Sequence, residues 1–416
     1  MFNKNNLLWV IGVGILFPLF FQLEGRIYRE FIPITDSQGD FLKVPIPISV
    51  LVCLACLFFL VRKIAPIIPA LLLSLGMLCA GLLSLWIAGD DVTSHQRKLV
   101  MIVQLMLPMS GLFLGQLVDD PKDKIAKAFL VVVSIIVPLQ LLATWLQGGL
   151  ILSHYLYAFS IYSHFQYVTL VFVCAFAYAQ TSLWDKQKVW LCLLGVAMAI
   201  YAVSSLSFLT IFAYFSFVFS FSASRLLVSR PNGAKSALIA ILIVIVSMVS
   251  YTYFEKMDGQ RASVEGDTGF FHSKFKSLAE GKIPLNVQER FDDWKFFGNE
   301  ILESKRTLFF GHAQPMPREV KSSPHNFYID IAHTFGMIGL LPIFGLIGYT
   351  AYMVARQRKS LSASSWWLLV IASFLVVVDS NFKVTLRQPY PGIFTYFLWG
   401  LLLTRLQIAV PGRQSS

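Results

Sequence analysis

An arginine in a polar segment of the chain has the neighbours of an anion-binding residue. It lies in the string Arg290-Phe291-Asp292-Asp293-Trp294, which places a guanidinium one helical turn before a large indole. A guanidinium stays charged at any working pH and matches a phosphate with two parallel hydrogen bonds. A solvated arginine paired with Asp292 or Asp293 is the alternative. The string therefore favours an anion site and leaves a surface ion pair open.

A histidine further along the chain is the second candidate for chemistry. His325 follows Pro324 and stands at the start of an apolar helix that we expect over residues 328–355. The N-terminus of a helix favours anions, because its first N–H groups carry partial positive charge. Imidazole is also the side chain whose unperturbed pKa lies nearest neutrality, so His325 could act as a general base. A contact that caps the helix at a membrane surface is the alternative.

The elements that position these residues belong to a membrane protein. Of 416 residues, 56% are hydrophobic and 14% are charged, whereas soluble proteins carry about 25% charged residues. The mean hydropathy of +0.66 excludes a soluble globular protein, because a bilayer and not water must be the main solvent. We therefore predict an all-α integral membrane protein.

Apolar segments near the length of about 20 residues that crosses a bilayer predict about twelve transmembrane helices. They lie near residues 7–23, 44–61, 64–88, 99–118, 128–146, 164–181, 189–203, 206–222, 237–253, 328–355, 366–380 and 391–404. The chain divides accordingly into helices 1–9 within residues 1–253, one large loop over residues 254–327, and helices 10–12 with a short tail within residues 328–416.

Lysine and arginine are unevenly distributed over alternate loops. The loops on the side of the two termini hold 16 of them and the short loops on the other side hold 7. The long segment 254–325 is left out, because long loops translocate regardless of charge. The imbalance predicts that both termini are cytoplasmic. The first apolar segment is expected to be an uncleaved anchor, since Phe20, Phe21 and Gln22 stand where a small-residue cleavage site would be needed.

Two other classes of site are disfavoured by the placement of cysteine and of charge. Cys53 and Cys56 form a C-x-x-C pair inside an apolar stretch, but a zinc site of this kind needs a second ligand pair that the sequence lacks. The net charge of +11 comes from basic residues scattered over short loops. Such scatter fits membrane orientation and does not form the stripe that nucleic acid requires.

The long segment 254–325 is the only large extramembrane part that the sequence predicts, with 11 basic and 11 acidic side chains. Apolar residues recur at helical spacing in its second half. They are Phe291, Trp294, Phe297, Ile301 and Leu302. This spacing predicts an amphipathic helix over residues 287–304 that lies on the membrane domain.

Three motifs within residues 290–345 resemble those of the O-antigen ligase and O-antigen polymerase superfamily, which are bacterial membrane glycosyltransferases that use polyprenyl-diphosphate-linked glycans. The string from Arg290 to Trp294 resembles the family's arginine, three residues and an anchor. Thr307-Leu308-Phe309-Phe310-Gly311 resembles its P-L-F-G turn. The third motif is the histidine-asparagine helix start, and it matches His325-Asn326-Phe327-Tyr328 with Gly336, Gly339 and Leu340.

The resemblance implies roles for individual residues. His325 would be the catalytic base, and Arg290 would bind the diphosphate together with a second arginine, either Arg387 or Arg26. The residues that would support the loop and the helix are Trp294, Gly311, Asn326 and Gly336. No D-x-D or H-E-x-x-H arrangement is present in the sequence, so we expect neither a catalytic metal nor another cofactor.

The resemblance also implies substrates and a place in the cell. The donor would be a glycan on undecaprenyl diphosphate, and the acceptor would be a sugar hydroxyl of a growing glycan or of lipid A core. The site would face the periplasm from the bacterial inner membrane, where a chain-length regulator could be a further partner. No nucleic acid is expected.

Departures from the family pattern bear on the choice between its two activities. Thr307 replaces the usual proline, Ala313 replaces a common second glycine, and Ser207-Phe208 lacks an arginine that often follows a serine there. The missing arginine favours a polymerase over a ligase.

A transporter or a flippase of lipid-linked glycans is the alternative from another class. Coupled transporters usually carry ionisable residues inside their helices. The candidates here are Asp330, His333 and Asp379, and all three lie near the end of an expected span. A flippase would also have little use for a large extramembrane loop.

The predicted orientation can be tested by labelling. A tag inserted near Gly266 should react with a membrane-impermeant reagent from the periplasm, and a tag at Asn232 should be protected, because of the 16 to 7 imbalance of basic residues. Protection of the tag near Gly266 in intact cells would place the loop in the cytoplasm and contradict the orientation.

Overall fold

The computed structural model describes residues 4–17, 48–60, 65–88, 92–120, 122–146, 165–205, 207–228, 285–312 and 323–408. Every secondary-structure element within these ranges is a helix, which confirms the all-α class. Five helical segments are long and apolar enough to cross a membrane. They are Ile68–Ile87, Lys124–Leu146, Tyr167–Ser204, Phe327–Gln357 and Ala363–Phe382. The expected span 237–253 and the candidate residue Arg26 lie outside the described residues.

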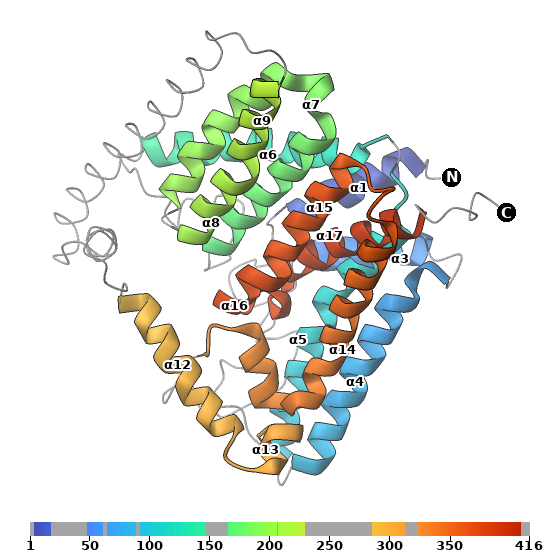
Figure 1. The fold of residues 1–416 in the computed structure, drawn as a ribbon, viewed down its shortest axis with the longest axis vertical. Coiled ribbons are helices and arrows are strands. Elements are labelled where there is room, and N and C mark those ends of the chain that lie inside the picture. Colours follow the sequence, from blue (N-terminus) through green and yellow to red (C-terminus); the bar gives the residue numbers. More distant parts are fainter. Residues whose placement is uncertain are drawn as a thin grey trace. The chain divides into compact units, whose positions relative to one another are not determined.

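The chain forms two compact units (Figure 1). Unit 1 comprises Met1–Lys122 and Glu289–Ser416, and unit 2 comprises Asp123–Gln288. The described helices of unit 1 are α1 (Lys4–Leu16), α3 (Ile48–Leu60), η1 (Ala65–Ile67), α4 (Ile68–Ala88), α5 (Val92–Leu117), α12 (Leu285–Ile301, which begins just before the boundary), α13 (Lys305–Phe310), α14 (Phe327–Gln357), α15 (Ala363–Ser373), η4 (Phe374–Asp379), α16 (Ser380–Phe382), η5 (Thr385–Arg387) and α17 (Pro389–Ile408). Unit 2 contains α6 (Lys124–Leu146), α7 (Phe165–Ser204), α8 (Phe208–Ala213), η3 (Tyr214–Phe219) and α9 (Ser220–Val228).

Helix α7 of unit 2 folds back on itself at Gln187, whose φ of −141° and ψ of 34° are not helical. The rings of Phe172 and Tyr201 stack with centroids 6.1 Å apart. In a straight helix the two residues would be about 43 Å apart at 1.5 Å per residue. The two arms of α7 therefore correspond to the separate helices expected over residues 164–181 and 189–203.

The packing of α5 against α17 forms the core of unit 1. A Cβ on Gly111 would lie 2.3 Å from the carbonyl oxygen of Ile393, and one on Gly115 would lie 2.3 Å from that of Phe397. Glycines four residues apart thus let the two backbones touch, as small residues do between membrane helices. This contact fixes the start of α17 and the segment that leads into it.

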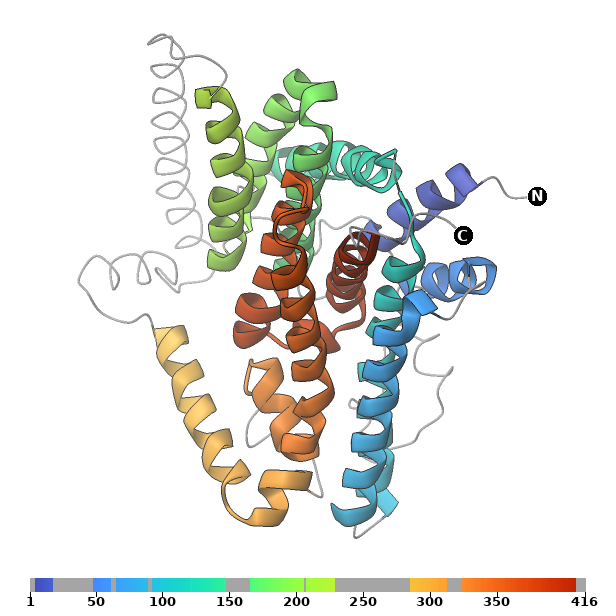
Figure 2. The same cartoon turned by 45° about the vertical axis from the view of Figure 1, so that its right-hand side comes forward.

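Helix α14 reverses its direction at Gly336, which has a φ of 70° and a ψ of −174°. The rings of Tyr328 and Phe344 stack 5.8 Å apart at 9°, whereas a straight helix would separate them by about 24 Å. A short arm, residues 327–335, therefore folds back along a long arm, residues 337–357 (Figure 2). The sequence predicted a single continuous helix over residues 328–355. This prediction was wrong, because the helix reverses at Gly336.

The reversal is held by a reciprocal contact between two glycines and two backbones. A Cβ on Gly336 would lie 2.2 Å from the carbonyl carbon of Phe309, at the end of α13. A Cβ on Gly311, which follows α13 with a φ of 77°, would lie 2.4 Å from the carbonyl carbon of Thr334. Both positions need glycine, because a side chain has neither the space nor the usual backbone angles there.

Two buried side chains cover this contact from α4 and α5. Ser84 Oγ donates a hydrogen bond to the carbonyl oxygen of Phe310 at 2.5 Å, and Lys98 Nζ donates to Ser84 Oγ at 2.8 Å. Both residues are fully buried. The carbonyl groups that the reversal of α14 exposes thus find partners inside the protein, as buried backbone groups require.

The reversal can be tested with one pair of glycine substitutions. Gly336→Ala should lower the free energy of unfolding by at least about 2 kcal/mol, because the added Cβ meets the backbone of α13 and alanine avoids positive φ. Gly345→Ala in the long arm is the matched control. No atom within 4 Å opposes a Cβ at Gly345, and alanine should stabilise a helix interior by about 0.5–1 kcal/mol. Thermal unfolding in detergent measures both, and equal effects would refute the reversal.

Candidate functional site

The predicted amphipathic helix is present as α12, and it packs with a narrower face than the sequence indicated. Phe297 and Ile301 are buried, with 2% and 8% of their surface exposed, whereas Phe291 is 45% exposed. Leu302 lies beyond the end of α12 and is 69% exposed, so its predicted place on the packed face was wrong. The buried side chains hold α12 against the rest of unit 1.

The turn after α12 gives Thr307 a structural role that proline could not fill. Thr307 and Ser304 form a capping box at the start of α13, with Ser304 Oγ accepting from Thr307 N. Thr307 Oγ1 also donates to the carbonyl oxygen of Ile301 at 3.0 Å. Proline has no N–H for the cap, so threonine closes this turn in a way that proline could not.

Arg290 reaches from α12 to the last residue of α16. Its Nη1 donates to the carbonyl oxygen of Phe382 at 2.8 Å. One turn later, Trp294 Nε1 donates to the carbonyl oxygen of Pro324 at 2.9 Å, and its ring lies 5.8 Å from that of Phe382. These contacts place the guanidinium beside the residues that lead into α14.

His325 lies one residue before the N-cap of α14. Its φ of 49° is in the left-handed region, which histidine tolerates better than most residues. Its side chain is exposed, and its N–H donates to Ser323 Oγ at 3.1 Å. The position of its backbone is thus set by Pro324 on one side, through Trp294, and by the cap on the other.

Asn326 is the N-cap itself. Its Oδ1 accepts from the N–H groups of Tyr328 and Ile329 at 2.9 and 3.1 Å, and its Nδ2 donates to Asn381 Oδ1 at 3.0 Å. A cap of this kind contributes about 1 kcal/mol to a helix. Here the same side chain also ties the start of α14 to the residue next to Phe382.

Arg387 pairs with a carboxylate one turn into α14. Its Nη1 lies 2.6 Å from Asp330 Oδ2. Two further ionic groups stabilise the same segment, since Lys383 Nζ lies 3.5 Å from Asp379 Oδ1 and Thr385 Oγ1 donates to Asp379 Oδ2. The pairing holds Arg387 near the start of α14 and offsets part of its positive charge.

The predicted site residues therefore fall into two groups at the two ends of the short arm of α14. Arg290, Trp294 and Asn326 contact residues within 379–388, Arg387 belongs to that segment, and His325 directly precedes Asn326. Gly311 and Gly336 form the reversal at the other end of the arm. Sequence reasoning missed the importance of residues 379–388, although a polar string at the end of an apolar helix is a signal that could have revealed it.

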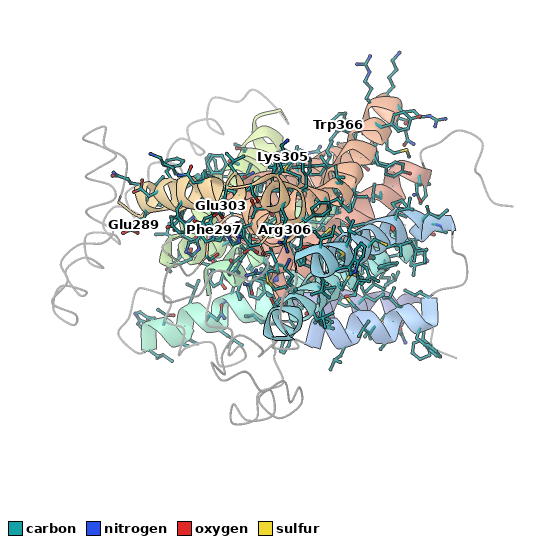
Figure 3. The ribbon with its side chains drawn as sticks, turned by 90° about the horizontal axis from the view of Figure 1, so that it is seen from below. Glu289, Phe297, Glu303, Lys305, Arg306 and Trp366 are labelled. Atoms are coloured by element: carbon teal, nitrogen blue, oxygen red, sulfur yellow. The ribbon has the colours of Figure 1, made fainter. Side chains whose placement is uncertain are left out.

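A cluster of possible metal ligands, which sequence reasoning also missed, lies beside the reversal. The rings of His312 and His333 stack with centroids 4.3 Å apart at 17°, and the ring of Phe297 packs edge-on against His333. One ligand atom from each of Glu300, His312 and His333 lies within 4.8 Å of the others. Figure 3 views this end from below, with Phe297 on α12 labelled. His312 follows Glu300 by 12 positions, and His333 follows His312 by 21 positions. The three residues therefore form no short motif that could be recognised in the sequence.

Comparison with known proteins gives no independent assignment, because neither a family model nor a curated protein matches the chain.

The contact between α12 and the segment before α14 can be tested at Trp294. Trp294→Phe keeps the aromatic packing against Phe382 and removes the N–H that bonds Pro324, so it should cost about 1 kcal/mol of unfolding free energy. Trp366→Phe on α15, where the indole is 40% exposed, is the matched control and should change stability by less than about 0.5 kcal/mol. Thermal unfolding measures both effects. An unchanged unfolding free energy in Trp294→Phe would show that this hydrogen bond does not stabilise the contact.

Proposed function

We propose that the protein is a membrane glycosyltransferase, most simply an O-antigen or exopolysaccharide polymerase. It moves a glycan from undecaprenyl diphosphate to a sugar hydroxyl at the periplasmic face of the inner membrane. The chain crosses the membrane about twelve times with both termini in the cytoplasm. The observation that carries the proposal is that Arg290 and Asn326, the residue after His325, both contact the segment 379–388, which contains Arg387.

The chemistry assigned to these residues is a single inverting displacement. The acceptor oxygen bonds to the anomeric carbon while the bond from that carbon to the diphosphate oxygen breaks. His325 takes the acceptor proton, a role typically worth about 10²–10⁴-fold in rate. Arg290 holds the departing diphosphate, whose negative charge grows as the bond breaks. No covalent intermediate and no catalytic metal are required.

Several features of the described residues suit these roles. His325 is exposed, so a large acceptor can approach it. Arg290 carries a guanidinium group, which matches the oxygens of a phosphate with parallel hydrogen bonds. The N-terminus of α14 adds a partial positive charge beside His325. Arg387 is the more indirect candidate, since Asp330 already shares its charge.

The state of the acidic residues supports an enzyme over a coupled transporter. Asp330 is paired with Arg387, and Asp379 is engaged by Thr385 and Lys383. In a coupled transporter such carboxylates mark an ion or proton pathway through the membrane. The two pairs here instead stabilise the segment around which the site residues gather.

The choice of polymerase over ligase rests on Ser207. Its side chain accepts from Thr210 N and caps α8 in unit 2, and no arginine follows it in the sequence. A ligase of this family would be expected to use an arginine there for a further phosphate contact. The ligase that attaches the glycan to lipid A core is therefore the second candidate.

Surface polysaccharide from a deletion strain tests the proposal and separates the two candidates. Loss of a polymerase should leave lipid A core that carries a single repeat of the glycan. Loss of a ligase should instead leave polymer on the lipid carrier and unmodified core. A normal polysaccharide profile would contradict both.

The role of His325 can be tested by replacing its chemistry while keeping its charge. His325→Ala and His325→Arg should both lower the rate of glycan transfer at least about 100-fold with unchanged affinity for the lipid donor, because a base acts on the acceptor. The rate of the unaltered protein should fall as pH drops through the imidazole pKa, which is about 6.5 when unperturbed.

Transfer assays with purified protein and lipid-linked donor measure these effects. Lys305→Ala on α13 is the control, because this exposed lysine lies outside the gathered residues. An active His325→Arg variant would show that the residue serves as a cation and not as a base.

A further inference from the structure

Three separate elements each bring one metal-ligating side chain to the reversal of α14. Glu300 lies in the last turn of α12, His312 follows the end of α13, and His333 lies in the short arm of α14. The backbone N–H of His312 donates to the carbonyl oxygen of His333 at 2.9 Å. We propose that Glu300, His312 and His333 bind a divalent transition-metal ion of the zinc class.

The positions of the two imidazoles are fixed before any ion arrives. His312 Nε2 lies 3.1 Å from the backbone carbonyl oxygen of Glu300, so this ring is held at α12. His333 is confined between the rings of His312 and Phe297. A metal ion would therefore meet ligands whose freedom is already restricted, which lowers the entropic cost of binding.

The buried side of the cluster contains a nitrogen that needs an explanation. His333 is 3% exposed, and its Nε2 has no hydrogen-bond partner within the part of the chain that the structure describes. Buried polar atoms are nearly always satisfied, so an exception indicates strain, an ordered water or an ion. A coordinated metal ion would satisfy this lone pair directly.

The set of donor atoms selects the class of ion. Two imidazole nitrogens and one carboxylate oxygen are ligands that zinc accepts in tetrahedral sites, with a water in the fourth position. Bonds of about 2.0–2.1 Å place tetrahedral ligands about 3.4 Å apart. From the present limit of 4.8 Å the ligand atoms must move closer together, and the stacked rings of His312 and His333 must tilt so that both lone pairs point at one ion. Calcium and magnesium prefer sites made of oxygen alone.

The surrounding charges set a condition on binding. Lys98 lies near His333, and Arg306 lies near Lys98. Burial, and secondarily the charge of Arg306, lower the pKa of Lys98 to about 8, so the lysine loses its proton more easily than usual. The carboxylate of Glu300 balances one positive charge. A nearby positive charge opposes the binding of a divalent cation, and the carboxylate ligand offsets part of that opposition.

The site would have a mechanical role at a distance from the proposed chemistry. The ion would connect α12, which carries Arg290, to the short arm that begins beside His325. It would therefore brace the reversal without touching the substrate. The inference stands on the three ligands alone and does not depend on the proposed glycan transfer.

Zinc titration of the full chain tests the site. The protein is purified in detergent, freed of any histidine tag, treated with a chelator and titrated with ZnCl₂ by calorimetry. We expect one ion per chain and a higher melting temperature with zinc. Co²⁺ should give the visible absorption of a tetrahedral site with nitrogen and oxygen ligands.

Substitutions of the ligands distinguish this site from incidental binding. Glu300→Gln keeps the backbone carbonyl that holds His312, and His312→Asn keeps a side chain of similar polarity, so both variants should fold. Each should weaken zinc binding at least about tenfold and lose most of the thermal shift. Glu303→Gln, at an exposed glutamate on the same turn (Figure 3), is the matched control and should bind zinc normally.

Two results would overturn the proposal. One is the absence of a stoichiometric zinc site in the unaltered chain. The other is equal zinc affinity in Glu300→Gln, His312→Asn and the Glu303→Gln control. Either result can be obtained without an activity assay, so it is independent of the proposed function.

Discussion

The contact between the backbones of α13 and α14 at Gly311 and Gly336 is the constraint on which the rest of unit 1 depends. Each glycine sits against the carbonyl group of the opposite segment, at a distance that excludes a Cβ. The contact permits α14 to reverse. In a straight α14, Asn326 and His325 would lie about 24 Å or more from Phe344, whose ring now stacks on that of Tyr328.

The gathering of site residues follows from this reversal and from one other rigid contact. The short arm of α14 delivers Asn326 to Asn381. The close packing of α5 and α17 holds the far end of the same segment, just after Arg387. Residues 379–388 are therefore anchored at both ends, and Arg290 reaches them from a third element. A loop fixed in this way can present side chains with the precision that catalysis requires.

The sequence predicted the elements better than it predicted their arrangement. Hydropathy identified the apolar helices, because burial in lipid demands long apolar runs. It also placed the break in α7 near Gln187, where two lysines flank the turn. The reversal of α14 escaped prediction, because glycine inside an apolar helix is common in membrane proteins and its φ cannot be read from its neighbours.

The candidate site was predictable only in part for a related reason. Arg290 and His325 stand out by their sequence neighbours, since Trp294 follows Arg290 by one helical turn and His325 lies between Pro324 and Asn326 at the start of an apolar helix. Their partners are a backbone carbonyl at Phe382 and an amide at Asn381, which carry no chemical signal in a sequence. The Glu300, His312 and His333 cluster depends wholly on tertiary structure, since its members come from three elements.

The hydrogen bonds of Ser84 and Lys98 at the reversal of α14 bear on the order in which the helices of unit 1 assemble. Ser84 Oγ donates to a carbonyl of α13 at 2.5 Å and lies 3.4 Å from a carbonyl oxygen of the short arm. The hairpin of α4 and α5 is synthesised more than 180 residues before either, and chains fold progressively from their N-termini during synthesis. The surface that receives the late segments thus exists before they emerge, and these segments need not expose unpaired carbonyl groups to lipid while they wait for a partner.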